Sequence, residues 1–140
     1  MTSRTHFLKC LKLGQIYEAK AEAKIEGKTI IKADDSNYKK YKFDFQKEDG
    51  LKYEIKFDDA SKLTNNCFIE FTDMKGRDSG LNITEANFYI IICGKDEEFL
   101  KIESDVLKIL CEKAHIRHAK DSSRGYIIPI RILKKYSTII

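Results

Sequence analysis

Two carboxylates and one lysine lie in strand-like sequence between positions 43 and 57. Asp44 stands between two phenylalanines, and Glu54 and Lys56 alternate with apolar residues. Carboxylate oxygens are ligands that Mg²⁺ prefers, and an ammonium beside such a site can orient water or stabilise charge that builds on phosphorus. These residue types at this spacing therefore predict a divalent-metal site that hydrolyses phosphodiester bonds.

A hairpin must bring these side chains together. Residues 41–46 and 51–58 alternate between apolar and polar types, which indicates two strands. The residues between them, 48–50, suit a three-residue loop whose glycine is left-handed. This register places Asp44 opposite Glu54 on one face, with Cβ atoms about 5 Å apart. Like charges so arranged destabilise a sheet, and a cation between them removes the repulsion.

A helix over residues 3–26 is predicted to supply a further ligand. Its apolar stripe contains Glu18, and an inward carboxylate is costly unless it is paired or bound to metal. The predicted metal ligands are therefore Asp44, Glu54, Glu18 and the backbone carbonyl of Ile55. Lys56 is the predicted catalytic amine, and we expect burial near a metal to lower its pKa, as a role as base requires.

The remaining sequence predicts the other elements of one α/β domain over residues 1–140. We expect a loop at 34–37, strands at 28–32, 67–72, 88–93, 98–102 and 126–130, and helices at 104–114 and 131–136. The stretch 88–93 is continuously apolar, which predicts a central strand buried on both faces. The stretch 98–102 is expected at a sheet edge.

Three segments resemble the PD-(D/E)xK nuclease superfamily, in particular its small Holliday-junction-resolvase-like and phage or viral endonucleases. They read Gly14-Gln15-Ile16-Tyr17-Glu18, Phe43-Asp44-Phe45 and Tyr53-Glu54-Ile55-Lys56. The resemblance runs from about residue 14 to about residue 102, and Phe43 stands where the family signature has proline. It implies a restriction-endonuclease-like core, in which helices flank a mixed central β-sheet. It also implies Mg²⁺ or Mn²⁺ as cofactor, DNA as substrate, 5′-phosphate products, and Glu18, Asp44, Glu54 and Lys56 as site residues.

Charge is unevenly distributed along the chain. Residues 1–32 carry seven basic and three acidic side chains, and residues 113–140 carry seven basic and one acidic. The middle carries eighteen acidic and twelve basic side chains. The basic ends suit a polyanion and the acidic middle suits a metal, although an unevenly charged, solvated surface explains the same pattern.

Several polar residues outside the hairpin are candidates for contacts with nucleic acid. They are Lys39, Lys40, Lys62, Asn65, Lys75 and Arg77. Lysines interleaved with aromatic residues at 38–41 suit nucleic acid, and equally suit an edge strand protected by lysines. The others lie in predicted loops, where an ordinary solvated loop is the competing interpretation. Glu70 is a candidate for an extra polar group beside the site.

Other classes of function are weaker. Cys111, His115 and His118 have metal-like spacing, but a zinc site needs further ligands and a thiol catalyst needs an orienting acid. A non-catalytic nucleic-acid-binding module of the same fold is the main alternative to an endonuclease. A protein-interaction domain with an acidic surface is the third.

The four cysteines form no CxxC pair and are expected to be reduced core residues. No signal peptide is evident, and the longest apolar run is far too short to span a bilayer. We therefore expect no membrane partner and a soluble protein of the cytosol, the nucleus or an infected cell. A homodimer would supply two opposed sites for cutting two strands.

Overall fold

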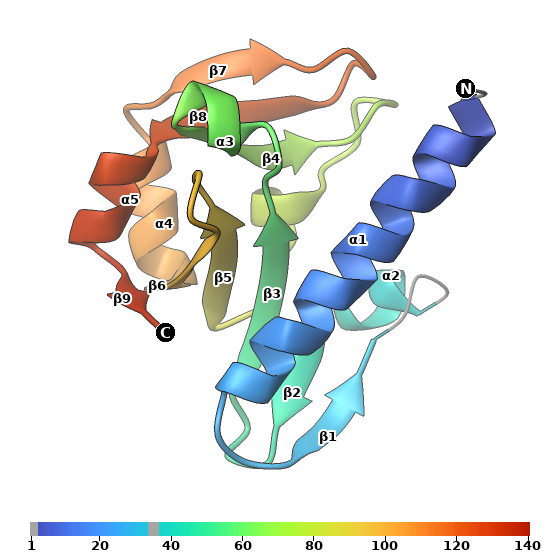
Figure 1. The fold of residues 1–140 in the computed structure, drawn as a ribbon, viewed down its shortest axis with the longest axis vertical. Helices are drawn as coiled ribbons and strands as arrows, with labels where there is room; N and C mark the ends of the chain where they lie inside the picture. The colour runs from blue at the N-terminus through green and yellow to red at the C-terminus, as the bar shows by residue number, and fades with distance from the viewer. Residues whose placement is uncertain (1–2, 34–36) are drawn as a thin grey trace.

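The computed structural model describes residues 3–33 and 37–140, and the side chains of residues 12–33, 37 and 40–140. These residues form a six-stranded mixed sheet, in the order β1-β2-β3-β5-β6-β9, and a three-stranded antiparallel sheet, in the order β4-β8-β7 (Figure 1). The strands are β1 (Thr29–Lys32), β2 (Phe45–Lys47), β3 (Lys52–Phe57), β4 (Asn66–Thr72), β5 (Phe88–Cys93), β6 (Glu98–Glu103), β7 (His115–His118), β8 (Arg124–Pro129) and β9 (Thr138–Ile139). The helices are α1 (Ser3–Lys24), α2 (Tyr38–Tyr41), α3 (Ser61–Thr64), α4 (Ser104–Cys111) and α5 (Ile130–Lys135), with a 3₁₀ turn, η1, at Gly80–Asn82.

The larger sheet is the mixed central sheet that the sequence predicts. β5 pairs in parallel with β3 on one side and antiparallel with β6 on the other, and five of its six residues are buried. The prediction of a central strand at 88–93 is confirmed. β6 was predicted as an edge strand. In the structure the edge is instead the two-residue strand β9, which pairs with Leu100 and Lys101 of β6.

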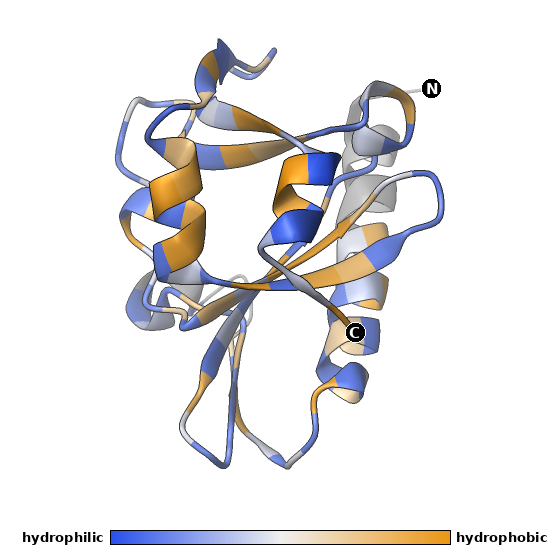
Figure 2. Cartoon of the chain, turned by 90° about the vertical axis from the view of Figure 1, so that its left-hand side faces the viewer, coloured by the Kyte–Doolittle hydropathy of each residue, from blue (hydrophilic) through white to orange (hydrophobic). Residues whose placement is uncertain are grey.

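The central sheet is covered differently on its two faces. α1 crosses one face over β3, and the smaller sheet lies over the other together with α4 and α5 (Figure 1). Alternate residues of β5 point to opposite faces, so Ile90 and Ile92 join Ala21 of α1, while Tyr89 and Ile91 join the second cluster. Apolar residues of α4 and α5 gather beneath the smaller sheet (Figure 2).

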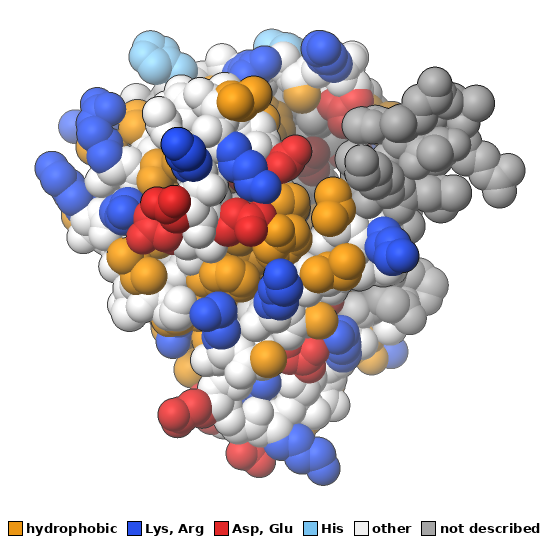
Figure 3. All heavy atoms as spheres, viewed as in Figure 1, with side chains coloured by type: hydrophobic (Ala, Val, Ile, Leu, Met, Phe, Trp, Pro, Cys, Tyr) orange, Lys and Arg blue, Asp and Glu red, His pale blue; other side chains and the backbone are white. Residues whose placement is uncertain are grey.

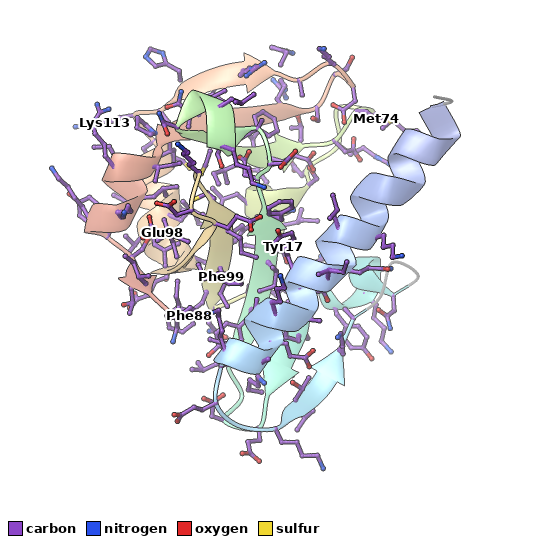
Figure 4. All side chains as sticks on the ribbon, in the orientation of Figure 1. Tyr17, Met74, Phe88, Glu98, Phe99 and Lys113 are labelled. Carbon is purple, nitrogen blue, oxygen red and sulfur yellow. The ribbon has the colours of Figure 1, made fainter. Side chains whose placement is uncertain are left out.

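α1 packs on β3 through the described part of the predicted stripe together with Tyr17. Ala21 is fully buried, and the ring of Tyr17 stacks on Phe57 with centroids 3.9 Å apart (Figure 4). The Tyr17 hydroxyl donates to the carboxylate of Glu97. Ala21 and Ile25 of the predicted stripe pack in this cluster, and Glu18 is half-buried; Tyr17, which the stripe did not include, adds an aromatic ring to the contact.

Several element boundaries differ from the predicted ones. The strand expected from residue 41 begins at Phe45, because residues 38–41 form α2 and Lys42 takes a left-handed conformation with φ 56°. A helix, α3, replaces part of the loop expected after β3. The helix expected over 104–114 ends at Cys111, and β7 follows it. The loop expected at 34–37 lies, in its first three residues, outside the described part of the chain.

The strand expected at 67–72 does form, as β4, but it leaves the central sheet. It pairs with β8 along almost its whole length, and β8 pairs in turn with β7. Nothing local in the sequence distinguishes a strand that joins one sheet from a strand that joins another. Among the helices that the structure describes, none is long and apolar enough to cross a membrane.

The cluster beneath the smaller sheet is the main source of stability in this half of the domain. Leu107 of α4 is fully buried in it. We expect Leu107→Ala to lower the free energy of unfolding by about 2 to 5 kcal/mol, because the substitution leaves a cavity that the core closes only in part. The control is Ile109→Ala on the same helix, where the side chain is 63% exposed and we expect a change within about 0.5 kcal/mol. Chemical denaturation measures both, and equal losses would contradict this assignment of the core.

Candidate active site

The predicted hairpin forms with the predicted register. Phe45 pairs with Tyr53 and Gln46 with Lys52, and the loop between the strands ends in Gly50 with φ 89°. Asp44, one residue before β2, lies outside the paired residues, so its predicted pairing with Glu54 does not form, but both side chains line one cavity. Both side chains therefore lie on the face of the central sheet that is turned toward the smaller sheet.

Asp44 directly precedes β2, and it bonds to β3 through both its backbone and its side chain. Its backbone N–H donates to the carbonyl of Tyr53 at 2.9 Å, and its Oδ2 accepts the N–H of Ile55 at 2.7 Å. The N–H and C=O of one strand residue point to the same side. The carbonyl of Ile55 therefore points to the same edge of β3 as its N–H, next to the Asp44 carboxylate. At this level β2 no longer pairs with that edge.

Glu54 is buried beside Asp44, with only 1% of its surface exposed. The Nζ atom of Lys56 lies 3.6 Å from its Oε1, and the lysine side chain is 39% exposed. Tyr89 of β5 is in register with Glu54 and is also buried. Burial raises the pKa of Tyr89, and the charges of Glu54 and Asp44 raise it further, so the phenol stays protonated at neutral pH.

The electrostatics of Lys56 differ from the expectation. Burial lowers its pKa, but the carboxylates of Glu54, Asp44 and Glu70 outweigh burial, and the net shift is upward. Lys56 is therefore an ammonium at neutral pH. That protonation state suits stabilisation of negative charge better than it suits removal of a proton from water.

These residues line one cavity of about 530 Å³. Asp44, Glu54, Ile55 and Lys56 form one wall, and β4 with the following turn, residues 73–83, forms the opposite wall. The lining carries five carboxylates and three basic side chains, so the cavity attracts a cation. On the face shown in Figure 3, acidic side chains lie in a hollow under the smaller sheet, next to basic ones.

The opposite wall contains residues that the sequence alone did not single out. The Ser79 hydroxyl donates to the Glu70 carboxylate at 2.8 Å, which fixes that carboxylate in the lining. Gly80 has φ 45°, and a Cβ atom at this position would overlap the Glu70 backbone carbonyl. Glu70 and Arg77 were candidates from the sequence, whereas Gly80 was not, because the pairing of Thr72 with Asp78 that folds this turn back is not a local pattern.

Glu18 does not join the other site residues. Glu18 is not one of the described residues that line the cavity. Its charge helps to raise the pKa of Lys32. Within the described part of the chain, no group of three or more His, Cys, Asp or Glu side chains is close enough to hold a metal. The donor set at the cavity is thus two carboxylates, Asp44 and Glu54, with the carbonyl of Ile55.

The predicted nucleic-acid contacts are scattered. Arg77 lines the cavity and pairs with Asp73 through Nε at 2.9 Å, and Lys75 is exposed on the same turn. Lys40 is exposed, with its Nζ 5.3 Å from the ring centroid of Tyr41. The side chain of Lys39 lies outside those that the structure describes.

Lys62 and Asn65 have structural partners away from the cavity. Lys62 pairs with Glu97 at 3.1 Å and with Asp59 at 3.4 Å. Asn65 ends α3 in a left-handed conformation, and its carbonyl accepts the N–H of Ile130. Asparagine tolerates this conformation better than most residues, which explains its place in the sequence.

The cysteines with described side chains, Cys67, Cys93 and Cys111, are buried free thiols, as predicted; the side chain of Cys10 is not among those described. Burial raises the pKa of Cys111 to about 12, whereas His115 and His118 are exposed on β7. The metal-like spacing of these three residues therefore does not correspond to a site.

A scan against models of protein families finds no match to the chain. A search of curated proteins finds none that matches.

Proposed function

We propose that this protein is a metal-dependent endonuclease that hydrolyses phosphodiester bonds of DNA, with the site chemistry of the PD-(D/E)xK nucleases. The observation that carries the proposal is the cavity at the end of β2. It brings together Asp44, Glu54, the Ile55 carbonyl and Lys56, in a lining with excess negative charge. An ordinary solvated strand face does not bury a glutamate to 1% exposure beside a second carboxylate.

The donor set fits Mg²⁺ or Mn²⁺. Both ions take oxygen ligands, and Mg²⁺ commonly binds through one or two carboxylates while it keeps several waters. Asp44, Glu54 and the Ile55 carbonyl supply oxygens from two adjacent strands, and a cation would relieve the repulsion between the two carboxylates. When bound, the metal would activate water and offset charge on the phosphate.

Each protein group then has a distinct task. Asp44 and Glu54 hold the metal against the phosphodiester, and the Asp44 bond to the N–H of Ile55 keeps that carboxylate in place. Lys56, protonated and next to Glu54, stabilises the negative charge that grows on the phosphoryl oxygens as water attacks. Cutting of two strands would require two such sites, for which we propose a homodimer.

Metal binding gives a test that does not depend on cleavage. We expect Mn²⁺ to raise the melting temperature of the protein, since a ligand at 100 times its Kd stabilises by about 2.7 kcal/mol. Glu54→Gln, which keeps the shape and removes the charge, should abolish this shift. Glu112→Gln, at an exposed position on the far end of α4, should retain it.

Cleavage is tested with linear, branched and single-stranded DNA in Mn²⁺. The proposal requires products with wild-type protein and with Glu112→Gln, and none with Glu54→Gln. DNA binding without cleavage, together with an Mn²⁺-independent melting temperature, would instead support the alternative of a non-catalytic nucleic-acid-binding module.

A further inference from the structure

A second cavity of about 450 Å³ adjoins the first. The two share Lys56 and Glu70 in their linings, so they adjoin at these residues, and together they are referred to as the groove. The far end of the second cavity is lined by Arg117 of β7 and by Lys120, from the turn that leads to β8. The groove therefore runs from the proposed metal ligands to the basic C-terminal part of the chain.

The register of the smaller sheet builds the second cavity. Glu70 pairs with Gly125, and Gly125 pairs with Arg117, so the three residues form a row across β4, β8 and β7. The ring of Phe68 covers the central position of this row: a Cβ atom on Gly125 would lie 2.6 Å from its Cε2. Glycine thus allows an aromatic ring to lie on the sheet, where Phe68 is part of the cavity lining.

The acidic groups of this cavity are already engaged within the protein. Asp58 accepts the backbone N–H groups of Ser61 and Phe68, Asp59 pairs with Lys62, and Glu70 accepts the hydroxyl of Ser79. By contrast, Arg117 and Lys120 form no ion pair with any residue that the structure describes. The two cations are therefore available to an anionic ligand.

We propose that the second cavity holds a single-stranded segment of the nucleic acid next to the phosphodiester that is cut. This inference rests on the proposed function. Arg117 and Lys120 contact backbone phosphates, and Phe68 stacks against a base. An aromatic side chain flanked by cations is the usual platform for unpaired bases, whereas the bases of an intact duplex are stacked and do not present a face to it. The substrate class is then DNA with a single-stranded branch or overhang.

The test measures binding without divalent metal, so that no cleavage occurs. The probes are a blunt duplex and the same duplex with an overhang of about six nucleotides. We expect the overhang to tighten binding by about tenfold, and Phe68→Leu to remove that advantage while Phe68→Tyr retains it. Arg117→Ala combined with Lys120→Ala should reduce the slope of log K against log salt by about 1.4 on the overhang probe.

The control removes two charges elsewhere. Lys108→Ala combined with Lys113→Ala removes two exposed lysines, one from α4 and one from the residues that follow it. Neither lysine lines either cavity. This variant should keep the wild-type slope. Equal binding of both probes, or an overhang advantage that survives in Phe68→Leu, would overturn the inference.

The outcomes also separate this inference from the proposed function. If wild-type protein prefers the overhang and the Phe68 variants behave as expected, but Mn²⁺ produces no cleavage, the groove stands and the hydrolytic function fails. If Mn²⁺ supports cleavage and the overhang preference is absent, the hydrolytic function stands and the single-strand groove fails.

Discussion

Lys56→Gln is expected to slow DNA cleavage by about 10²- to 10³-fold, which is the usual cost of removing one group that stabilises transition-state charge. The substitution replaces an ammonium by a neutral amide of similar length. Lys56 is protonated and lies 3.6 Å from Glu54, so under the proposed function it would contribute positive charge where the phosphoryl oxygens become more negative. The rate is measured at saturating DNA and Mn²⁺, so that a weaker affinity for either one does not lower the measured rate.

The same variant should bind Mn²⁺ at least as tightly as the wild type. The ammonium of Lys56 and the cation compete for the carboxylate of Glu54, so removal of the ammonium favours the metal. Calorimetry with Mn²⁺ measures this affinity. Loss of cleavage with retained metal binding separates Lys56 from Glu54, whose substitution should abolish both.

Lys135→Gln is the matched control, because Lys135 is an exposed lysine of α5. It should cleave at the wild-type rate. Full cleavage by Lys56→Gln would show that the lysine beside Glu54 is only a structural counter-charge.

Gly80→Ala is expected to lower the free energy of unfolding by about 2 to 5 kcal/mol, from left-handed strain and overpacking together. Gly80 is the first residue of η1 and is buried against β4, and a Cβ atom there would lie 3.0 Å from the Glu70 carbonyl carbon and overlap the oxygen bound to it. Backbone cannot move aside as a flexible side chain can. The substitution should therefore push the 73–83 turn away from β4 and open the wall of the cavity.

Gly76→Ala separates the two contributions. Gly76 also has a left-handed φ, of 76°, but nothing lies within 4 Å of the position of its missing Cβ. We expect this variant to lose only about 1 to 2 kcal/mol, the cost of the left-handed conformation alone. Chemical denaturation of both variants gives the difference, and equal losses would show that the contact with Glu70 is relieved at little cost.

The hairpin was predictable because its information is local. The length of the loop and the glycine at its end set which residues of 41–46 and 51–58 face each other, and alternation set which side chains share a face. The placement of Asp44 and Glu54 on one face, where both line the cavity, followed from these two facts, although the ladder ends one residue before Asp44. The central position of β5 was equally readable, because only a strand buried on both faces is apolar at every residue.

What the sequence could not give is the packing between distant segments. The stripe on α1 was predictable at Ala21 and Ile25, but the stacking of Tyr17 on Phe57 was not, because it depends on a strand that is distant in the sequence. The smaller sheet, the fold of the 73–83 turn and the cavity that contains Arg117 all depend on the pairing of β4 with β8, which no local pattern specifies.

The pairing of β4 with β8 also has a consequence for synthesis. β4 begins at Asn66, and its partner runs from Arg124 to Pro129, so a nascent chain exposes Cys67, Ile69 and Phe71 until the partner leaves the ribosome. An unpaired apolar strand in a partly made domain is prone to aggregate, and pairing across so long a stretch of chain is slow. We therefore expect the yield of active protein to depend on temperature and on chaperones during expression more strongly than its equilibrium stability suggests.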